Sequence, residues 1–182
     1  MKTIVRALLC VLFLLITPAK ASEYSSNFVI LPAIEREPNR VALWKSTPTV
    51  VVCKYAPVTE EQIHSAVTFW EKLGHLFYAT QYNHDPLNKC SQTSPVGYII
   101  VRLVAQGINL SEESLAVTHF YVDLDTNKID WAIIYLRNEV RETVLEHEIG
   151  HALGYLHYDK INHLMNSKWT QGGWDVEGLK YR

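Results

Sequence analysis

The hydrophobic positions between residues 49 and 136 predict five strands. A β-branched run over residues 49–55 is typical of a buried strand, and residues 77–82 and 96–104 fit two further strands. Residues 115–124 and 129–136 predict a hairpin, because the short segment between them is rich in turn formers. Strands of this kind, interrupted by helical patterns, favour a fold that mixes α and β structure.

Hydrophobic residues with helical spacing predict two helices. Thr59 and Gln62 match a capping box, and the apolar positions that follow keep to one helical face until Gly74. A second helix is expected to open near Asn138 and to run to Gly154. A mostly irregular tail follows it.

The first 21 residues have the pattern of a signal peptide. Lys2 and Arg6 precede an apolar run over residues 7–17, which is too short to span a bilayer comfortably, and residues 19–21 form a small-x-small cleavage site. We therefore expect residues 1–21 to be removed and the protein to be secreted or periplasmic, with no stable membrane insertion. An uncleaved anchor is the alternative.

Residues 22–46 are mixed in character, with Pro32, Pro38 and a charged patch, and they predict an irregular lead-in or a short pro-like segment. The domain itself is expected to span residues 47–182. The signal segment carries three of the 17 basic residues and none of the 19 acidic ones, so the mature chain is more acidic than the formal charge of −2. This balance does not support binding to nucleic acid or to an anionic membrane.

Removal of the signal segment would leave two cysteines, Cys53 and Cys90. An even pair in an exported protein indicates a disulfide, which in the chain-entropy model stabilises a loop of this length by roughly 4 kcal/mol. The alternatives are two buried thiols or a contribution to a metal site.

Residues 147–157 read His-Glu-Ile-Gly-His-Ala-Leu-Gly-Tyr-Leu-His and carry the candidate chemistry. On a helix, His147 and His151 lie one turn apart on the same face, so both imidazoles can bind one metal ion. Gly154 can adopt a left-handed conformation that ends the helix, which allows His157 to supply a third nitrogen. Glu148 is placed to act as a general base on water. Three imidazoles with one open position are typical of catalytic zinc.

A His-x-x-x-His pair alone is common on helices, but the longer stretch resembles the extended zinc signature of the metzincin metallopeptidases, His-Glu-x-x-His-x-x-Gly-x-x-His. Metzincins also carry a methionine turn beneath the metal, and Met165 follows His157 at a spacing similar to that of the matrixin branch. The alternative is that Met165 is an ordinary methionine of the hydrophobic core. Tyr158 matches none of the branch markers, so the branch stays open. The resemblance covers roughly residues 48–182. It implies an α/β (α+β) fold with a mixed, mostly parallel twisted sheet, an active-site helix and a Met-turn.

The resemblance also implies where a substrate binds. In metzincins an extended peptide pairs with an exposed edge strand above the metal, and residues 115–120 look like that strand; the alternative is an ordinary hairpin strand. Trp169 lies where matrixins carry a tyrosine in a pocket wall, although a surface or core tryptophan fits equally well. His119 and the acidic turn near Asp123 are similar to structural ion sites, but their ligand sets are incomplete. We expect one zinc ion and neither calcium nor a second zinc.

These observations predict a secreted zinc endopeptidase that acts as a monomer on protein or peptide substrates. His147, His151 and His157 would bind the zinc, and Glu148 would be the base. Two alternatives share the zinc site: a binding or inhibitor module that holds zinc without cleaving, and a zinc amidase that acts on cell-wall peptide. No Gly-x-Ser-x-Gly motif occurs, and the chain offers no candidate serine or cysteine nucleophile.

Overall fold

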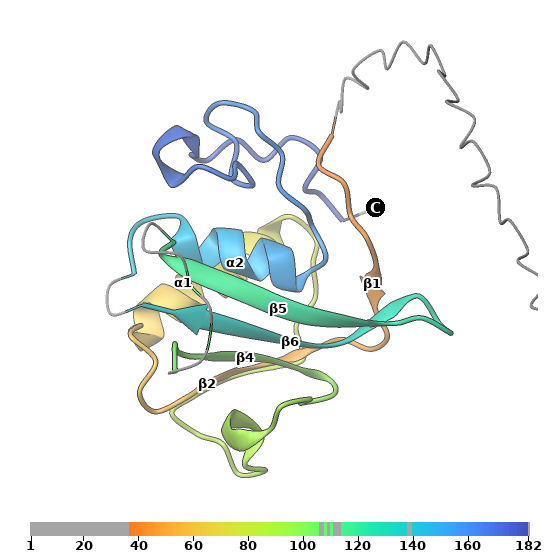
Figure 1. Cartoon of the computed structure of the whole chain (residues 1–182), viewed down its shortest axis with the longest axis vertical. Coiled ribbons are helices and arrows are strands. Elements are labelled where there is room, and N and C mark those ends of the chain that lie inside the picture. Colours follow the sequence, from red (N-terminus) through yellow and green to blue (C-terminus); the bar gives the residue numbers. More distant parts are fainter. Residues whose placement is uncertain (1–36, 106–107, 109, 111–113, 138–139, 182) are drawn as a thin grey trace, which may run out of the picture. The chain divides into compact units, whose positions relative to one another are not determined.

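A six-stranded, mostly parallel sheet carries two α-helices on one face (Figure 1), which makes the fold a mixed α/β structure. The computed structural model describes residues 37–105, 108, 110, 114–137 and 140–181. The predicted signal peptide (residues 1–21) and residues 22–36 lie outside the described residues. The elements are β1 (Leu43–Trp44), β2 (Thr49–Val52), α1 (Glu60–Lys72), β3 (Ala79–Tyr82), β4 (Tyr98–Leu103), β5 (Ala116–Asp123), β6 (Lys128–Leu136) and α2 (Val144–Ala152).

The strand order explains why the sheet is mixed. It runs β1-β6-β4-β2-β3 with all of these pairs parallel, while β5 lies off this path and pairs antiparallel with β6. The predicted hairpin is therefore confirmed, and so is the mostly parallel sheet. Among the described residues β5 pairs with no strand other than β6, so it is an edge strand, and it lies in front of α2 in Figure 1.

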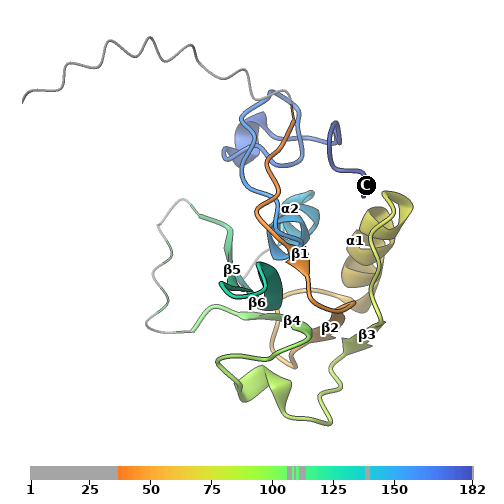
Figure 2. The ribbon, with the colours of Figure 1, turned by 90° about the vertical axis from the view of Figure 1, so that its right-hand side faces the viewer.

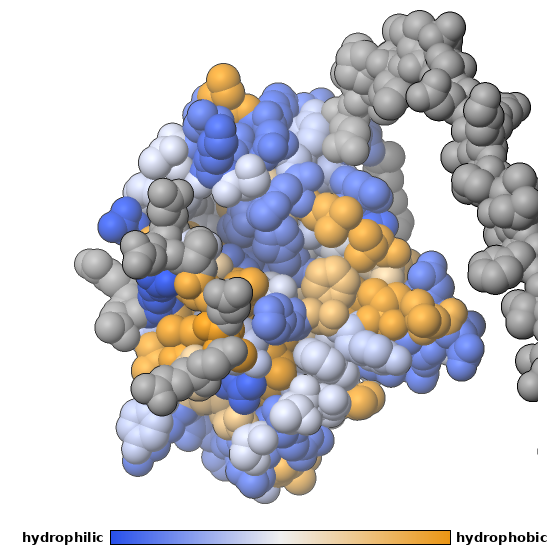
Figure 3. Space-filling model, viewed as in Figure 1, coloured by the Kyte–Doolittle hydropathy of each residue, from blue (hydrophilic) through white to orange (hydrophobic). Residues whose placement is uncertain are grey.

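The central strands are buried on both faces, which is why they read as continuous hydrophobic runs. On one face Val50, Val52, Ile99 and Val101 pack in the main core together with α1 and α2. On the other face, Val51 belongs to a second, smaller cluster with Ile100, Ile133 and Tyr135. Figure 2 shows α1 and α2 on the same side of the strands. Figure 3 shows hydrophobic side chains gathered over the β5–β6 hairpin.

The first helix begins and ends where the sequence predicts. The Thr59 side chain accepts a hydrogen bond from the Gln62 N–H (3.1 Å), and the Gln62 side chain accepts one from the Thr59 N–H (2.8 Å), so the capping box is confirmed. Gly74 follows the helix in a left-handed conformation, with φ +93°. The buried face of α1 includes Ile63 and Trp70, which turn toward α2 and the sheet.

The start of the second helix was predicted too early. Residues 138–139 lie outside the described residues, and residues 140–143 form a loop and a turn, so that α2 begins only at Val144. The cause is Thr143, whose left-handed backbone (φ +67°) cannot belong to a right-handed helix. The end is as predicted: Gly154 is left-handed (φ +95°), and a Cβ there would lie 2.5 Å from the Ala42 carbonyl oxygen. Only glycine fits this turn.

Residues 37–46, which the sequence analysis assigned to an irregular lead-in, are part of the fold. They contain β1, which pairs with the N-terminal end of β6. Arg40 Nε donates to the Leu153 carbonyl (2.9 Å), and Trp44 Nε1 donates to the Ala152 carbonyl (2.9 Å). Both bonds satisfy carbonyls at the C-terminal end of α2, which is where a helix needs partners. This segment therefore supports the turn on which the metal motif depends.

The predicted disulfide between Cys53 and Cys90 is confirmed. It joins the end of β2 to the short 3₁₀ helix Lys89–Ser91 beneath the second face of the sheet. A disulfide of this kind is typical of proteins that fold in an oxidising, extracellular-type environment. Within the described residues, no helix has the length and apolar character needed to span a membrane.

Candidate metal centre

The structure brings the three predicted ligands together at the C-terminal part of α2. His147 and His151 are on α2, and His157 follows the Gly154 turn, which directs the chain back toward the helix. The Nε2 atom of His151 lies 2.9 Å from Nε2 of His147 and 3.1 Å from Nε2 of His157. The group as a whole has the geometry of a site that could hold a metal ion.

Two backbone carbonyls determine which nitrogen of each helical imidazole carries the proton. His147 Nδ1–H donates to the Leu164 carbonyl at 2.7 Å, and His151 Nδ1–H donates to the Tyr155 carbonyl at 2.7 Å. A carbonyl oxygen only accepts, so in the neutral rings the lone pair is on Nε2. Both lone pairs are then directed at the same point, which is the arrangement of metal-binding histidines.

The donor set fits zinc. In a tetrahedral site with Zn–N distances of about 2.0–2.1 Å, neighbouring nitrogens are about 3.3 Å apart, close to the 2.9 and 3.1 Å separations here. Three lone pairs this close repel one another unless a cation or a proton lies between them. His157 is exposed, whereas the other two ligands are half-buried, so the site is accessible to solvent from one side.

Burial keeps the ligands in the neutral form that binds metals. It lowers the pKa of His147 to about 4 and that of His151 to about 3, and in His151 the neighbouring His147 lowers the pKa further. Burial also lowers the pKa of His157, an effect that Asp159 opposes. At neutral pH the Nε2 atoms of His147 and His151 therefore carry no proton that a cation would have to displace.

Glu148 lines the same cleft as His147 and His157 but does not belong to the histidine cluster. Its side chain is buried, with 6% exposed, and burial raises the pKa of its carboxyl group to about 7. The hydroxyl of Thr118 on β5 lies 2.5 Å from Glu148 Oε2 and 3.1 Å from its backbone carbonyl, so it can donate to either oxygen. Thr118 therefore orients the carboxylate from the edge strand. No local sequence pattern indicates this contact, so Thr118 is not among the site residues predicted from the sequence.

Met165 lies in a turn over residues 161–165, called the Met-turn below after this residue alone, and it packs against the helix that carries two of the histidines. It is fully buried in the main core, and its sulfur packs against Gly150, which lies on α2 between the two helical ligands. A Cβ at Gly150 would lie 2.5 Å from Met165 Sδ and 2.8 Å from Trp70 Cζ2. The glycine in this motif position thus allows the methionine to approach the helix, a role that the sequence analysis missed.

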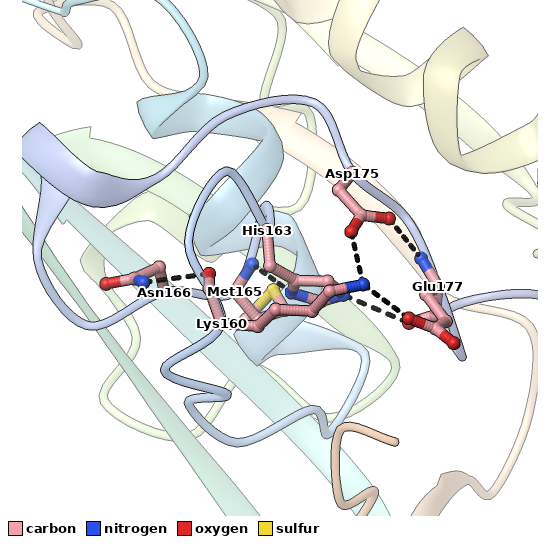
Figure 4. A network of polar contacts seen from close by, with 6 residues as sticks. All are labelled: Lys160, His163, Met165, Asn166, Asp175 and Glu177. Carbon is pink, nitrogen blue, oxygen red and sulfur yellow. Dashed lines mark hydrogen bonds and ion pairs between the residues drawn. The ribbon is translucent and has the colours of Figure 1, made fainter. Parts of the chain in front are cut away.

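The Met-turn is held from below by the C-terminal residues (Figure 4). His163 is fully buried; its Nδ1 accepts from the Met165 N–H (3.0 Å), and its Nε2–H donates to the Glu177 carbonyl (3.0 Å). Lys160 forms ion pairs with Asp175 (2.7 Å) and Glu177 (2.5 Å), which raise the pKa of its ammonium group. His163 is therefore a hydrogen-bonded histidine of the core.

A cleft of about 600 Å³ opens beside the histidines. Its walls come from the start of β5, the N-terminal part of α2 and the loop after the Met-turn. Trp169 lines it and donates from Nε1 to the Glu142 carbonyl at 3.1 Å. The lining residues are Ser114, Leu115, Ala116, Arg141, Thr143, Val144, His147, Glu148, His157, Leu164, Asn166, Ser167, Lys168, Trp169, Thr170 and Gly172.

The residues considered for other ion sites lie elsewhere. His119 is exposed on β5, with its ring 5.3 Å from that of Tyr135. Asp123 accepts from the backbone N–H groups of Asp125 and Thr126, and so stabilises the β5–β6 turn.

No protein-family model matches the chain, and no curated protein matches it in sequence. The functional assignment therefore rests on the motif and on the geometry of the site.

We predict that Gly150→Ala destabilises the protein, although alanine normally favours a helix by about 1 kcal/mol. The new methyl group would overlap Met165 and Trp70, and overpacking of this kind costs about 1–3 kcal/mol. The free energy of unfolding in urea measures the effect. Ser65→Ala, on the exposed face of α1, is the matched control and should cause no loss.

A double variant tests the cause. If the methyl group of the new alanine is destabilising because it meets Met165, Gly150→Ala should cost less in a Met165→Ala background, where only the contact with Trp70 remains. An equal cost in both backgrounds would contradict the proposed packing.

Proposed function

We propose that this protein is a zinc-dependent endopeptidase that hydrolyses peptide bonds without a covalent intermediate. The observation that carries the proposal is the convergence of three imidazoles with a buried carboxylate next to an open cleft. The match of residues 147–157 and Met165 to the metzincin pattern supports the same conclusion from the sequence.

His147, His151 and His157 would hold the metal. Bound there, zinc supplies a Lewis acid that polarises a carbonyl group and lowers the pKa of water to about 7. Glu148 accepts a proton from the attacking water and delivers it to the leaving amine. Thr118 holds the Glu148 carboxylate in place throughout, because its hydroxyl is within 2.5 Å of Oε2.

The strand β5 offers a place for an extended substrate. It is the edge of the described sheet, and the residues at its start line the cleft. A peptide that adds to this edge would be held by main-chain hydrogen bonds, so its affinity would depend little on its sequence. Side chains next to the cleaved bond would then enter the cleft.

Glu148 favours an enzyme over a module that only binds zinc. A carboxylate that is almost fully buried costs free energy, and three imidazoles do not need it as a ligand. A general base, in contrast, works best when its pKa lies near the operating pH.

Zinc should stabilise the folded protein. At a free zinc concentration of about 100 times the dissociation constant, linkage predicts about 2.7 kcal/mol of stabilisation, or a rise in melting temperature of about 5 to 10 °C. His157→Ala should lose most of this rise, whereas His64→Ala, on the exposed face of α1, should keep it. A zinc response that survives His157→Ala would place the metal elsewhere.

Glu148→Gln should separate zinc binding from catalysis. Glutamine keeps the shape and can still accept from Thr118, so the zinc-dependent rise in melting temperature should persist. The turnover number should fall by about 10²- to 10⁴-fold, because glutamine cannot take a proton. Glu61→Gln, on the exposed surface of α1, is the control and should leave turnover unchanged.

Digestion of protein and peptidoglycan substrates side by side, with Glu148→Gln and with the control Glu61→Gln, distinguishes the proposed function from its alternatives. Cleavage of protein substrates that depends on Glu148 supports the proposal. Glu148-dependent release of peptide from peptidoglycan alone would identify an amidase, and zinc binding with no turnover of either substrate would identify a binding module.

A further inference from the structure

Two cations line the cleft and form no ion pair with a described carboxylate, although Lys168 is close enough to Asp159 to help lower the pKa of that carboxyl group. Arg141 belongs to the turn before α2 and Lys168 to the loop after the Met-turn. In the described part of the chain, neither side chain has a carboxylate within ion-pair distance. The acid that lines the cleft with them is Glu148, which is buried and bound by Thr118.

Arg141 is held at the cleft wall by an aromatic contact. Its guanidinium carbon lies 5.0 Å from the centre of the Trp169 ring, and Trp169 is itself fixed by its hydrogen bond to the Glu142 carbonyl. A guanidinium that stacks on a ring leaves its N–H groups free to bind a carboxylate in two places. The contact thus orients Arg141 without using its donors.

Glu142, the acidic neighbour of Arg141 in the sequence, has a hydrogen-bond partner that does not line the cleft. The Glu142 carboxylate accepts a hydrogen bond from Trp174 Nε1 at 3.1 Å, and Glu142 does not line the cleft. The other lining side chains are mostly neutral and small to medium in size, such as Thr143, Asn166 and Thr170. The cleft therefore presents positive charge on walls that mix polar side chains with apolar ones such as Leu115 and Val144.

We propose that Arg141, assisted by Lys168, selects substrates that carry a carboxylate on a residue adjacent to the cleaved bond. This inference rests on the proposed peptidase function, because it assigns a substrate class to the same site. The carboxylate can come from an aspartate or glutamate side chain or from the C-terminus of a short peptide. Both sources offer the planar, two-oxygen group that a guanidinium binds.

The test compares four peptides that differ only at the positions next to the cleaved bond: glutamate, glutamine, leucine or lysine. Wild type should cleave the glutamate peptide with a kcat/KM about tenfold above the glutamine peptide, which corresponds to about 1.4 kcal/mol. A second pair, with a free or an amidated C-terminus one residue after the bond, distinguishes the two sources of the carboxylate.

Three substitutions of Arg141 isolate its charge. Arg141→Met keeps an unbranched side chain against Trp169 and should reduce the glutamate-to-glutamine ratio to near one. Arg141→Lys should keep part of the preference, and Arg141→Glu should reverse it toward the lysine peptide. Lys72→Met removes a cation at the end of α1, away from the cleft, and should leave the ratio unchanged.

A binding measurement separates this inference from the proposed function. The zinc-bound Glu148→Gln protein is titrated with the same peptides, followed by tryptophan fluorescence. If wild type cleaves none of the peptides, but the Glu148→Gln protein binds the glutamate peptide more tightly and loses this advantage with Arg141→Met, the peptidase function is wrong and the carboxylate site stands. Equal binding and equal cleavage of the glutamate and glutamine peptides, or a preference that persists in Arg141→Met, would overturn the inference.

Discussion

The candidate metal centre depends on two hydrogen bonds from imidazole Nδ1 atoms to backbone carbonyls. They fix the tautomer and the direction of His147 and His151, so that both lone pairs converge. Each carbonyl is itself positioned by a turn. The Tyr155 carbonyl follows Gly154, whose left-handed turn fits closely against Ala42. The Leu164 carbonyl belongs to the Met-turn, where the Leu164 N–H also donates to the Asp175 carbonyl at 2.8 Å.

Distant parts of the chain are therefore needed for one small site. Residues 37–46 satisfy the carbonyls at the end of α2, and residues 175–177 hold the Met-turn from below (Figure 4). Gly150 lets Met165 approach the helix between the two ligands. The edge strand contributes Thr118, whose hydroxyl donates to the Glu148 carboxylate. The sheet thus supplies a rigid support, and the loops supply the carbonyls and the cleft walls.

Local patterns predicted the elements whose signals lie within a few residues. The capping box of α1, the buried run of β2 and the hairpin turn each have a short signature, and the zinc motif is a single stretch of eleven residues. The start of α2 was missed because Val140 and Val144 keep helical spacing, although Thr143 between them adopts a left-handed backbone. The strand β1 has only two residues, too few for a periodic pattern. The contacts of Thr118 with Glu148 and of His163 with Glu177 span 30 and 14 residues, so no local pattern reveals them.

The central claim is that His147, His151 and His157 together bind one zinc ion. X-ray absorption at the zinc edge of the protein loaded with one equivalent of metal tests it most directly. The account predicts a first shell of three imidazole nitrogens at about 2.0–2.1 Å with one oxygen completing it, and the loss of one imidazole in His157→Ala. A shell that contains sulfur, or one that consists of oxygens alone, would contradict the account.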